Sequence, residues 1–506
     1  MSGRASRACD ACRLRKVKCN GSIPCSQCGH LNLACVFSTP PTKRKPTVRG
    51  RLVAQIRQGR DTSNSTSPQN ETSPVACVSP GIGSTYTTDF FLSLVPDYER
   101  VVFPMNPVLL PSEIVKTIHE MDQSNENTAM VYAFAASTIN LSRSSWDVDG
   151  LCITQITHLL NLGFKAHKQA EVGFGLQDKL PISVKRIITC IFLEHCFYIF
   201  KRFDRGLALL REASAMIQMI DLDRYTDASI SDHEIASRQR LYCDISIHER
   251  FLTVMTGYPA ILPPLSSGIP DRDHELLPHI DEGFNRLIEL FHVLDDTFLA
   301  HWRAQQDPKL SSPEMTAAWI EHKQAELDQH EIKTAETDGE LISNGCEGLT
   351  ELQHVDLFIT RLWMRILVWQ LALSQGLLQS APPQNSHEGF SMHFPAQRLS
   401  MQLRHLVCRL ENIDSIALHG QGILQKLFEI TSTVADVLAL PIGPDEGQEA
   451  EARVEDFLFI VTFLLTFDRI DQSQRQYLKE KLSTLQREQA GFQSLVTYNP
   501  DRWTSE

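Results

Sequence analysis

CDACRLRKVKCNGSIPCSQCGHLNLAC, residues 9–35, holds six of the thirteen cysteines of this 506-residue chain. The six thiols stand at Cys9, Cys12, Cys19, Cys25, Cys28 and Cys35. The spacing C-x2-C-x6-C therefore occurs twice, and the second copy follows the first by sixteen residues. So dense and regular an arrangement of thiols predicts a metal centre built from two related halves.

The number of ligands narrows the kind of metal centre. Thiolates in a reducing compartment favour zinc, and a structural zinc takes four tetrahedral ligands. Three cysteines per half leave a zinc one ligand short, and six sulfurs cannot fill the eight positions of two separate ions. Six sulfurs can fill all eight coordination positions if two of them each bridge both metals, so the sequence predicts two zinc ions. Metal binding would then supply much of the folding free energy, on the order of ~10 kcal/mol per zinc.

Other uses of the cysteines stay open at this stage. Disulfide bonds form in secreted proteins, but the first residues, MSGRASRACD, lack the apolar segment of a signal peptide. Independent zinc sites or an iron–sulfur cluster would need a different ligand set, and no histidine or acid stands at ligand spacing. Metal storage would leave most of the chain unexplained.

The two halves of the segment differ in charge. Four basic residues separate the second and third cysteines, and none separates the fifth and sixth. The four are Arg13, Arg15, Lys16 and Lys18. Residues 1–60 hold thirteen Lys and Arg and one acid, whereas the rest of the chain holds thirty-five Lys and Arg and sixty acids. A basic head on an acidic body predicts that the first half faces the phosphates and base edges of double-stranded DNA.

The segment resembles the fungal Zn2Cys6 binuclear zinc-cluster family of transcription factors, whose cysteine pattern and loop proline (Pro24) it matches throughout. In that family the first and fourth cysteines bridge the zincs, which implies Cys9 and Cys25 here. The resemblance also implies that Lys18 reads a CGG-type triplet in the major groove. The other three basic residues would contact phosphates or adjacent bases. Asn20 stands where the family often has Asp.

Residues 38–88 are expected to link this module to the rest of the chain. Five basic residues form a candidate nuclear-import signal or a second phosphate contact: Lys43, Arg44, Lys45, Arg49 and Arg51. Residues 61–85 are rich in Ser, Thr, Pro and Asn, and too polar to form a core. The family usually forms homodimers through a coiled coil in this region. Here only Val48, Leu52 and Ile56 match it, so the sequence leaves monomer and homodimer open.

The remaining chain predicts a large all-α domain, residues 89–440, followed by an acidic loop and C-terminal helices in 441–506. Helical periodicity marks 207–222, 231–257, 355–378 and 454–467, and polar breaks are expected at 304–350, 379–397 and 441–453. Ser231 and Glu234 form a candidate capping box, and Gly257 follows as a stop signal. The apolar run 457–467 is too short to span a bilayer, so no membrane partner is expected.

Residues 90–109, 205–224 and 238–264 resemble, more weakly, the "middle homology" regulatory domain of the same transcription factors. The resemblance implies a helical regulatory unit, in some members responsive to an effector. Glu249 and Arg250 match a recurring pair of that domain. We interpret them as part of a structural ion pair within the fold rather than as an effector contact.

These features predict a nuclear, zinc-dependent, sequence-specific regulator of transcription by RNA polymerase II, acting with the transcription machinery. A pathway-specific activator of a fungal gene cluster, for secondary metabolism or nutrient use, is the expected type. The sequence holds no HExxH, GxSxG or GxxxxGK pattern, so no catalytic residue and no enzyme activity are expected. The alternative is a zinc module for protein interaction, fused to a helical partner-binding or metabolic domain.

Overall fold

The computed structural model divides the chain into two compact units, residues 1–87 and 88–506. Each unit is described by itself. The structure describes residues 9–14, 17, 19–30, 35–36, 86–143, 150–172, 180–220, 230–307, 309–312, 314–380, 383, 386–439 and 447–490.

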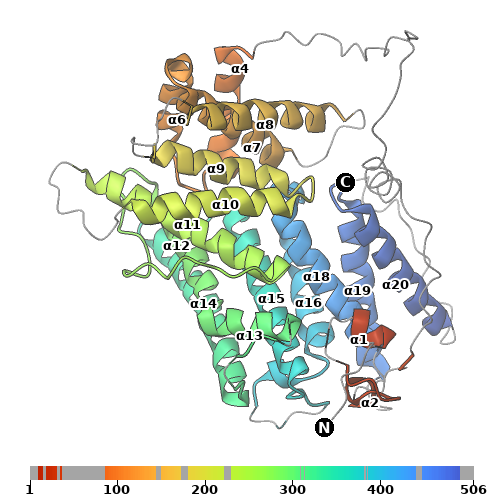
Figure 1. Ribbon diagram of the computed structural model, residues 1–506. Helices are drawn as coiled ribbons and strands as arrows, with labels where there is room; N and C mark the ends of the chain where they lie inside the picture. The colour runs from red at the N-terminus through yellow and green to blue at the C-terminus, as the bar shows by residue number, and fades with distance from the viewer. Residues whose placement is uncertain are drawn as a thin grey trace, which may run out of the picture. The chain divides into compact units, whose positions relative to one another are not determined.

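The N-terminal unit contains two short helices, α1 (Asp10–Leu14) and α2 (Ser26–His30) (Figure 1). Each begins immediately after the first cysteine of a C-x2-C pair, so the second cysteine of the pair lies within the first turn. The Oδ1 atom of Asn20 accepts a hydrogen bond from the Ser26 amide at 3.0 Å, at the start of α2. The predicted metal-stabilised module with two short helices is confirmed, and Asn20 offers the oxygen that an aspartate would offer there.

The described part of the second unit is helical throughout, which confirms the predicted all-α body. Its strand-type pairing within the described residues is a single bridge between Gln379 and Ser391. In chain order the elements are α4 (Thr88–Ser93), α5 (Val95–Asp97), η1 (Tyr98–Val102), α6 (Pro111–His119), η2 (Met121–Gln123), α7 (Asn125–Ser142), α8 (Leu151–Gln169), α9 (Val184–Phe197), α10 (Phe203–Met219), α11 (Asp232–Thr256), α12 (Pro278–His292), α13 (Asp296–Gln306), α14 (Ala317–Ser343), α15 (Glu351–Ser374), η3 (Glu388–Phe390), η4 (Pro395–Leu399), α16 (Ser400–Arg409), α17 (Asp414–Ala417), α18 (Gly420–Leu438), α19 (Gly447–Thr466) and α20 (Gln472–Ala490).

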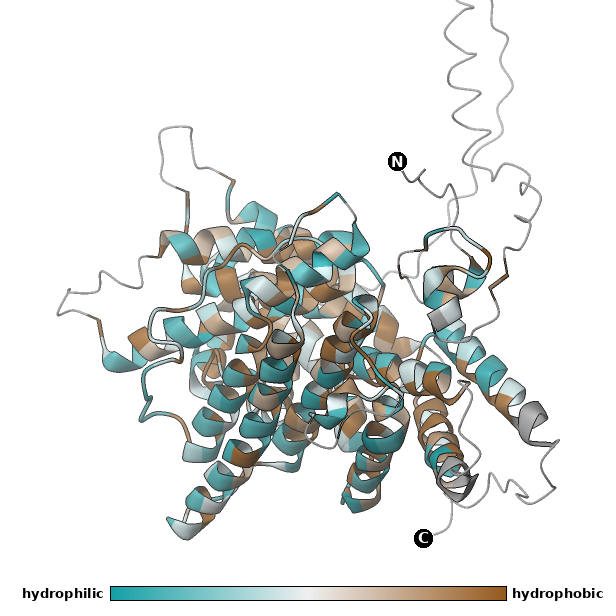
Figure 2. Cartoon of the chain, turned by 90° about the horizontal axis from the view of Figure 1, so that it is seen from below, coloured by the Kyte–Doolittle hydropathy of each residue, from teal (hydrophilic) through white to brown (hydrophobic). Residues whose placement is uncertain are grey.

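The body helices pack mainly against neighbours in the chain, with α15 and α18 joining more distant segments. In Figure 1 the helices α7 to α10 lie together at one end, where α7 packs on α8 and α9, and α10 packs on α9 and α11. The helix α15 contacts α12, α13, α14, α17 and α18. Figure 2 shows helices that combine hydrophobic and hydrophilic residues, as expected when one side of a helix is buried.

The helix α15 is the core helix of the body. Its buried residues lie on all sides, and Trp363 is fully buried with its indole Nε1–H donating to Glu429 Oε2 at 2.7 Å. By length and composition alone this helix could cross a membrane, but 83% of its most apolar window is buried inside the protein. The helix also buries polar and charged side chains, among them Asp356, Arg361 and Arg365, and such burial against other helices is typical of a core helix.

The best-marked predicted helix, 231–257, forms as α11. The Ser231 Oγ accepts a hydrogen bond from the Glu234 amide at 3.2 Å, which is one half of the predicted capping box. The Glu234 carboxylate pairs with Arg238 instead of returning to the Ser231 amide. At the other end Gly257 has φ of 78°, the left-handed conformation that ends many helices and that glycine adopts without a steric penalty.

The predicted polar break at 304–350 is wrong over most of its length, because α14 fills Ala317–Ser343. The helix buries polar side chains as well as apolar ones: Lys323 is 2% exposed, and its Nζ lies 2.7 Å from Asp295 Oδ2. The break predicted at 441–453 is also shorter than expected, since α19 begins at Gly447. The helices α19 and α20 pack on α16 and α18, within the same compact unit as the rest of the body.

The buried Glu249 of α11 forms an ion pair within the fold, as the sequence predicts, but its partner is the partly exposed Arg211 of α10 and not Arg250. The Glu249 carboxylate also accepts hydrogen bonds from the Ser214 hydroxyl and from the amides of Ile261 and Leu262. Arg250 points elsewhere and donates to the Ser246 side chain and carbonyl. Through these contacts Glu249 connects α11 both to α10 and to residues 261–262, which follow α11 in the chain.

Candidate metal centre

The side chains of the six clustered cysteines converge in the N-terminal unit. Cys9, Cys12, Cys25 and Cys28 are fully buried, while Cys19 and Cys35 are partly exposed. The Cys9 sulfur lies 3.7 Å from the Cys25 sulfur and 3.5 Å from the Cys28 sulfur, and Cys12 lies 3.5 Å from Cys25. These sulfur–sulfur separations are far longer than a disulfide bond, and none of the six cysteines is disulfide-bonded.

The sulfurs fall into two overlapping groups of four. Within each group all ligand atoms lie within 4.8 Å of one another: Cys9, Cys12, Cys19 and Cys25 form one, and Cys9, Cys25, Cys28 and Cys35 form the other. Cys9 and Cys25 belong to both. Four sulfurs at this separation are what one tetrahedral ion requires, and sharing two of them lets six sulfurs surround two ions.

Backbone amides repeat the same two-half arrangement. The Cys9 amide donates to the Cys19 sulfur at 3.5 Å, and sixteen residues on, the Cys25 amide donates to the Cys35 sulfur at 3.2 Å. The Cys12 amide likewise donates to Cys9 at 3.5 Å, and the Cys28 amide donates to Cys25 at 3.3 Å. Hydrogen bonds of this kind stabilise thiolates, which are the form that binds metal.

The two shared cysteines differ electrostatically from their neighbours. Burial raises the pKa of the Cys25 thiol, but the Cys28 amide and the surrounding thiols outweigh burial and lower it to about 6. The pKa of Cys9 is lowered in the same way. Burial and the adjacent sulfurs raise the pKa of Cys12 and of Cys28. The amide hydrogen bonds to Cys9 and Cys25 thus favour the thiolate form of the two sulfurs common to both groups.

This donor set fits two zinc ions. All the donors are thiols, which suits soft or borderline metals, and each group has four of them in a volume that one tetrahedral ion would fill. The sharing of Cys9 and Cys25 agrees with the pair of bridging ligands implied by the family resemblance. It is also the arrangement that the ligand count requires.

The predicted DNA-contact residues are only partly within the described structure. Arg13 lies in α1, the helix that follows Cys9, whereas Arg15, Lys16 and Lys18 lie outside the described residues. The same holds for the import candidates in 43–51 and for the heptad positions Val48, Leu52 and Ile56. Their assignments stay predictions.

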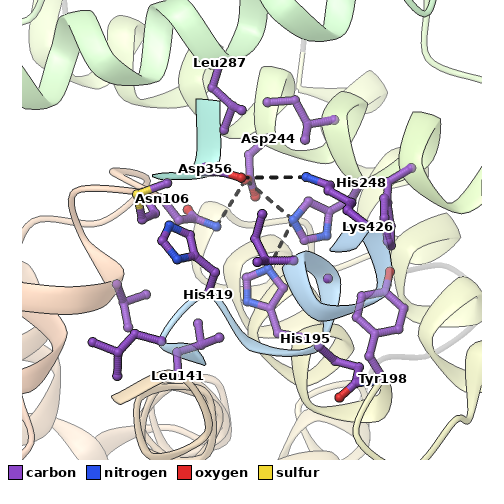
Figure 3. Close-up of a pocket in the computed structure, with 18 of the residues that line it drawn as sticks. Asn106, Leu141, His195, Tyr198, Asp244, His248, Leu287, Asp356, His419 and Lys426 are labelled. Atoms are coloured by element: carbon purple, nitrogen blue, oxygen red, sulfur yellow. Dashed lines mark hydrogen bonds and ion pairs between the residues drawn. The ribbon is translucent and has the colours of Figure 1, made fainter. Parts of the chain in front are cut away.

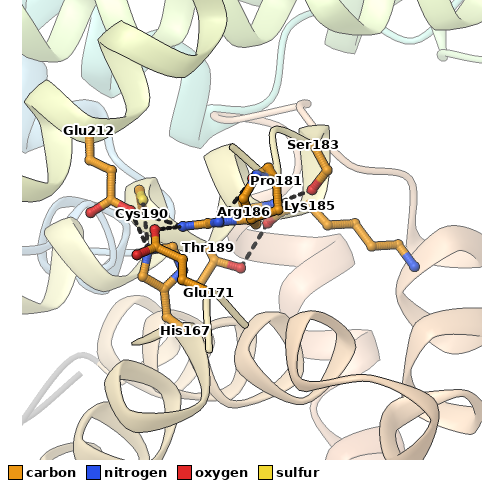
Figure 4. Close-up of polar contacts among 9 residues, drawn as sticks. All are labelled: His167, Glu171, Pro181, Ser183, Lys185, Arg186, Thr189, Cys190 and Glu212. Carbon is orange, nitrogen blue, oxygen red and sulfur yellow. Dashed lines mark hydrogen bonds and ion pairs between the residues drawn. The ribbon is translucent and has the colours of Figure 1, made fainter. Parts of the chain in front are cut away.

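A second group of potential metal ligands lies in the body, where His167, Cys190 and Glu212 meet (Figure 4). Glu212 Oε1 lies 2.7 Å from His167 Nε2 and 3.3 Å from Arg186 Nη2. Arg186 is 1% exposed and also contacts Glu171 and the Pro181 carbonyl. A guanidinium already neutralises the carboxylate, so we interpret this cluster as a structural ion pair that joins α8, α9 and α10.

A third group, Glu194, His195 and His248, forms a chain of hydrogen bonds. His248 Nδ1 lies 2.9 Å from Glu194 Oε2, and its Nε2 lies 3.2 Å from His195 Nε2. Burial alone would lower the pKa of His248, but Glu194 and Asp244 outweigh it and raise it to about 9. Burial lowers the pKa of His195, so His195 is the neutral acceptor. The histidines are satisfied without a metal.

The sequence patterns considered above do not identify Glu194, His195 or His248. A signal was present, because CIFLEHCF (190–197) places an acid and a histidine inside an otherwise apolar run. A polar pair at such a position predicts a buried polar network. Which groups complete that network depends on α11, which lies about fifty residues away in the chain and cannot be inferred from the run itself.

Comparison with known proteins places this geometry in a family. A model described as "Fungal Zn(2)-Cys(6) binuclear cluster domain" matches residues 7–45. The maltose fermentation regulatory protein MAL13 of Saccharomyces cerevisiae is 24% identical over 445 residues, covering 86% of this chain and 84% of that protein. The probable sucrose utilization protein SUC1 of Candida albicans is 23% identical, covering 90% and 83%. The respiratory transcription factor ZNF1 of S. cerevisiae is 23% identical, covering 93% and 92%.

The similarity to these proteins extends through the helical body as well as the cysteine cluster. A domain of this type binds two zinc ions and is a DNA-binding module, in agreement with the two groups of four sulfurs. The chain therefore carries a Zn2Cys6 binuclear-cluster domain at its N-terminus, and over most of its length it is similar to fungal transcription regulators.

Proposed function

We propose that this protein is a nuclear activator of fungal nutrient-use genes, and that its six clustered cysteines hold two zinc ions with Cys9 and Cys25 as the bridging ligands. The observation that carries the proposal is the pair of overlapping four-sulfur groups, together with basic residues in only one half of the cysteine segment. The basic half, residues 13–18, would read a CGG-like triplet. The uncharged half, residues 29–34, would support it.

The proposed pathway rests on the relatives. Proteins named for maltose fermentation and sucrose utilisation align over more than four-fifths of the chain, so carbohydrate use is the favoured process. Genome-wide mapping of bound sites tests it directly. Enrichment of bound sites upstream of genes for sugar uptake or hydrolysis is expected. Enrichment at a secondary-metabolite gene cluster would instead assign the protein to secondary metabolism.

Lys18→Ala should relax sequence specificity, because a base contact is lost while phosphate contacts remain. We expect the preference for a CGG-type triplet over a single mismatch to fall by about tenfold, equivalent to roughly 1–3 kcal/mol per lost base contact.

Arg13→Ala should instead weaken binding to all sequences alike and reduce the slope of log affinity against log salt concentration by about one. Binding-site selection and titrations at several salt concentrations measure both effects.

Gln27→Ala is the matched control, because Gln27 lies in α2 of the uncharged half. Its specificity and salt slope should equal those of the unchanged protein. Unaltered triplet preference in Lys18→Ala would remove the assignment of Lys18. A protein that holds two zincs but binds no DNA at low salt would favour the alternative, an interaction module fused to a helical domain.

The basic segment after the cluster gives a further prediction. Replacing Lys43, Arg44, Lys45, Arg49 and Arg51 with alanine should move the protein from the nucleus to the cytosol in living cells, measured as a tagged fusion. If import is the role of this segment, attaching an unrelated import signal restores nuclear localisation and function. If the localisation is unchanged, and the variant binds DNA more weakly and with a smaller salt dependence than the unchanged protein, the segment contacts phosphates instead.

A further inference from the structure

A cavity of about 180 Å³ lies inside the helical body. Its lining comes from seven elements that are distant in sequence: η1, α7, α9, α11, α12, α15 and α18. Figure 3 shows the polar side chains that surround it, among them Asn106, Asp244, Asp356 and Lys426. Because the lining spans residues 101–426, any molecule bound there would contact nearly the whole length of the body.

Two buried oxygens in this lining lack a hydrogen-bond partner among the described residues. They are Asn106 Oδ1 and Asp244 Oδ2, and their residues are 7% and 3% exposed. The other polar atoms of this pair bond each other, since Asn106 Nδ2 donates to Asp244 Oδ1 at 3.1 Å. Buried polar atoms are nearly always paired, so two unpaired acceptors beside one cavity indicate that a donor from a ligand completes them.

The lining also offers a donor. The Lys426 Nζ is 2.7 Å from Thr360 Oγ1 and 3.7 Å from Asp356 Oδ1, and it lies 5.5–5.8 Å from the ring centres of Phe291, Phe251 and Trp363. An ammonium group carries three protons, and one hydrogen bond uses only one of them. A lining that holds both acceptors and a donor suits hydroxyl groups, which both donate and accept.

Charges of both signs lie around the cavity. Asp356 faces Lys426, and the charged His248 is shared by two carboxylates, Glu194 at 2.9 Å and Asp244 at 3.8 Å. His195 is neutral, and so is the deeply buried His419, whose pKa burial lowers. Lys426 would repel a cationic ligand, and Asp244 and Asp356 would repel an anionic one. The lining therefore favours an uncharged molecule.

Size and shape limit the ligand further. A dry cavity of ~150 Å³ in another protein holds one benzene molecule, so the volume here accepts a single six-membered ring rather than two linked rings. Phe251 and Phe291 form part of the wall and supply apolar surface for the C–H groups of such a ring. Drug-sized ligands need larger pockets, of roughly 300 Å³ or more.

We propose that this cavity is an effector site for a neutral polyhydroxylated molecule with one ring, of the size of a single sugar, held between Asn106, Asp244 and Lys426. The proposal goes beyond DNA binding by the zinc module and does not depend on which genes are regulated. Occupation of the cavity would add contacts among η1, α11 and α18, and would thereby stabilise one arrangement of them.

Calorimetric titration of the full-length, zinc-loaded protein tests the proposal. The probes are D-glucose and myo-inositol as neutral rings, glucosamine and glucuronate as charged rings, and cyclohexanol as a ring with one hydroxyl. Saturable one-to-one binding of a neutral polyol is expected, at least tenfold tighter than binding of either charged ring. Equal or tighter binding of a charged ring or of cyclohexanol overturns the proposed chemistry, and binding of none of the probes overturns the site.

Two variants place the binding in this cavity. Asp244→Asn keeps the side-chain shape, and Lys426→Met keeps the contact with the aromatic rings but loses the donor; each should weaken binding about tenfold or more. Asp281→Asn is the control, because Asp281 is also buried, has a pKa raised by burial to about 6, and lies outside the cavity. Unchanged affinity in Asp244→Asn contradicts the site even if Lys426→Met fails to fold. Zinc content and DNA binding of the same samples report separately on the proposed function.

Discussion

Cys25→Ala is expected to release both zinc ions and abolish specific DNA binding, whereas Cys19→Ala should release only one. The Cys25 sulfur belongs to both groups of four, so its loss leaves each ion with three ligands; Cys19 belongs to one group. A structural zinc contributes on the order of ~10–16 kcal/mol to folding such a module. Zinc per chain, measured by elemental analysis after gel filtration, should fall from two to near zero in Cys25→Ala.

The body supplies the control for this experiment. Cys408 is exposed on α16, and Cys408→Ala should keep two zincs and unchanged DNA affinity. The helical signal in circular dichroism should persist in all three variants, because the core around α15 contains none of the clustered cysteines. Retention of two zincs by Cys25→Ala would mean that Cys25 is not a shared ligand, and the bridging assignment would have to move to another cysteine.

The zinc module could be predicted from sequence because its information is local. The six ligands lie within twenty-seven residues, and both their spacing and their number constrain the chemistry. Four tetrahedral ligands per zinc and six available sulfurs leave bridging as the economical solution, and the observed overlap at Cys9 and Cys25 agrees with it. The positions of α1 and α2 follow from the same spacing.

The body could be predicted in class but not in all its elements. The helix α14 was missed because its few buried apolar residues, such as Ile320 and Leu327, are separated by buried Lys323, Gln324 and His330. Hydrophobic periodicity cannot detect a face that is buried through ion pairs and hydrogen bonds. By contrast, α11 carried Ser231 and Gly257 as local start and stop signals, and both of them operate in the structure.

The cavity could not be predicted at all. Asn106, Asp244 and Lys426 come from three segments of the chain, and nothing in the neighbouring sequence of any one of them indicates the other two. Their association depends on how α11 and α18 pack near the turn that follows η1. The sequence could indicate only that polar residues interrupt apolar helices, and the identity of their partners is a property of the tertiary structure.

Glu249→Gln is expected to destabilise the helical body by about 1–3 kcal/mol, the typical cost of leaving buried hydrogen-bond donors without their acceptor. The unchanged carboxylate receives four donors: the Arg211 guanidinium, the Ser214 hydroxyl at 2.9 Å, and the amides of Ile261 and Leu262 at 3.0 and 2.8 Å. A carboxamide has one acceptor oxygen, and its NH2 group would face some of these donors. At least one N–H and the Arg211 charge would then lose their partner.

Urea unfolding followed by circular dichroism measures the loss, and Glu234→Gln is the matched control. Glu234 lies on the same helix but is exposed, and its pairing with Arg238 is a surface contact between residues four apart, worth at most about 0.5 kcal/mol. Equal stability of the two variants would show that the four donors find water or other partners when the carboxylate is removed. If instead Glu249→Gln unfolds early while the zinc module still binds DNA, the stability of the body is separable from DNA recognition, as two compact units imply. In such a regulator the helical body can lose its function while the zinc module still binds DNA, because the unfolding remains within the unit that holds the cavity.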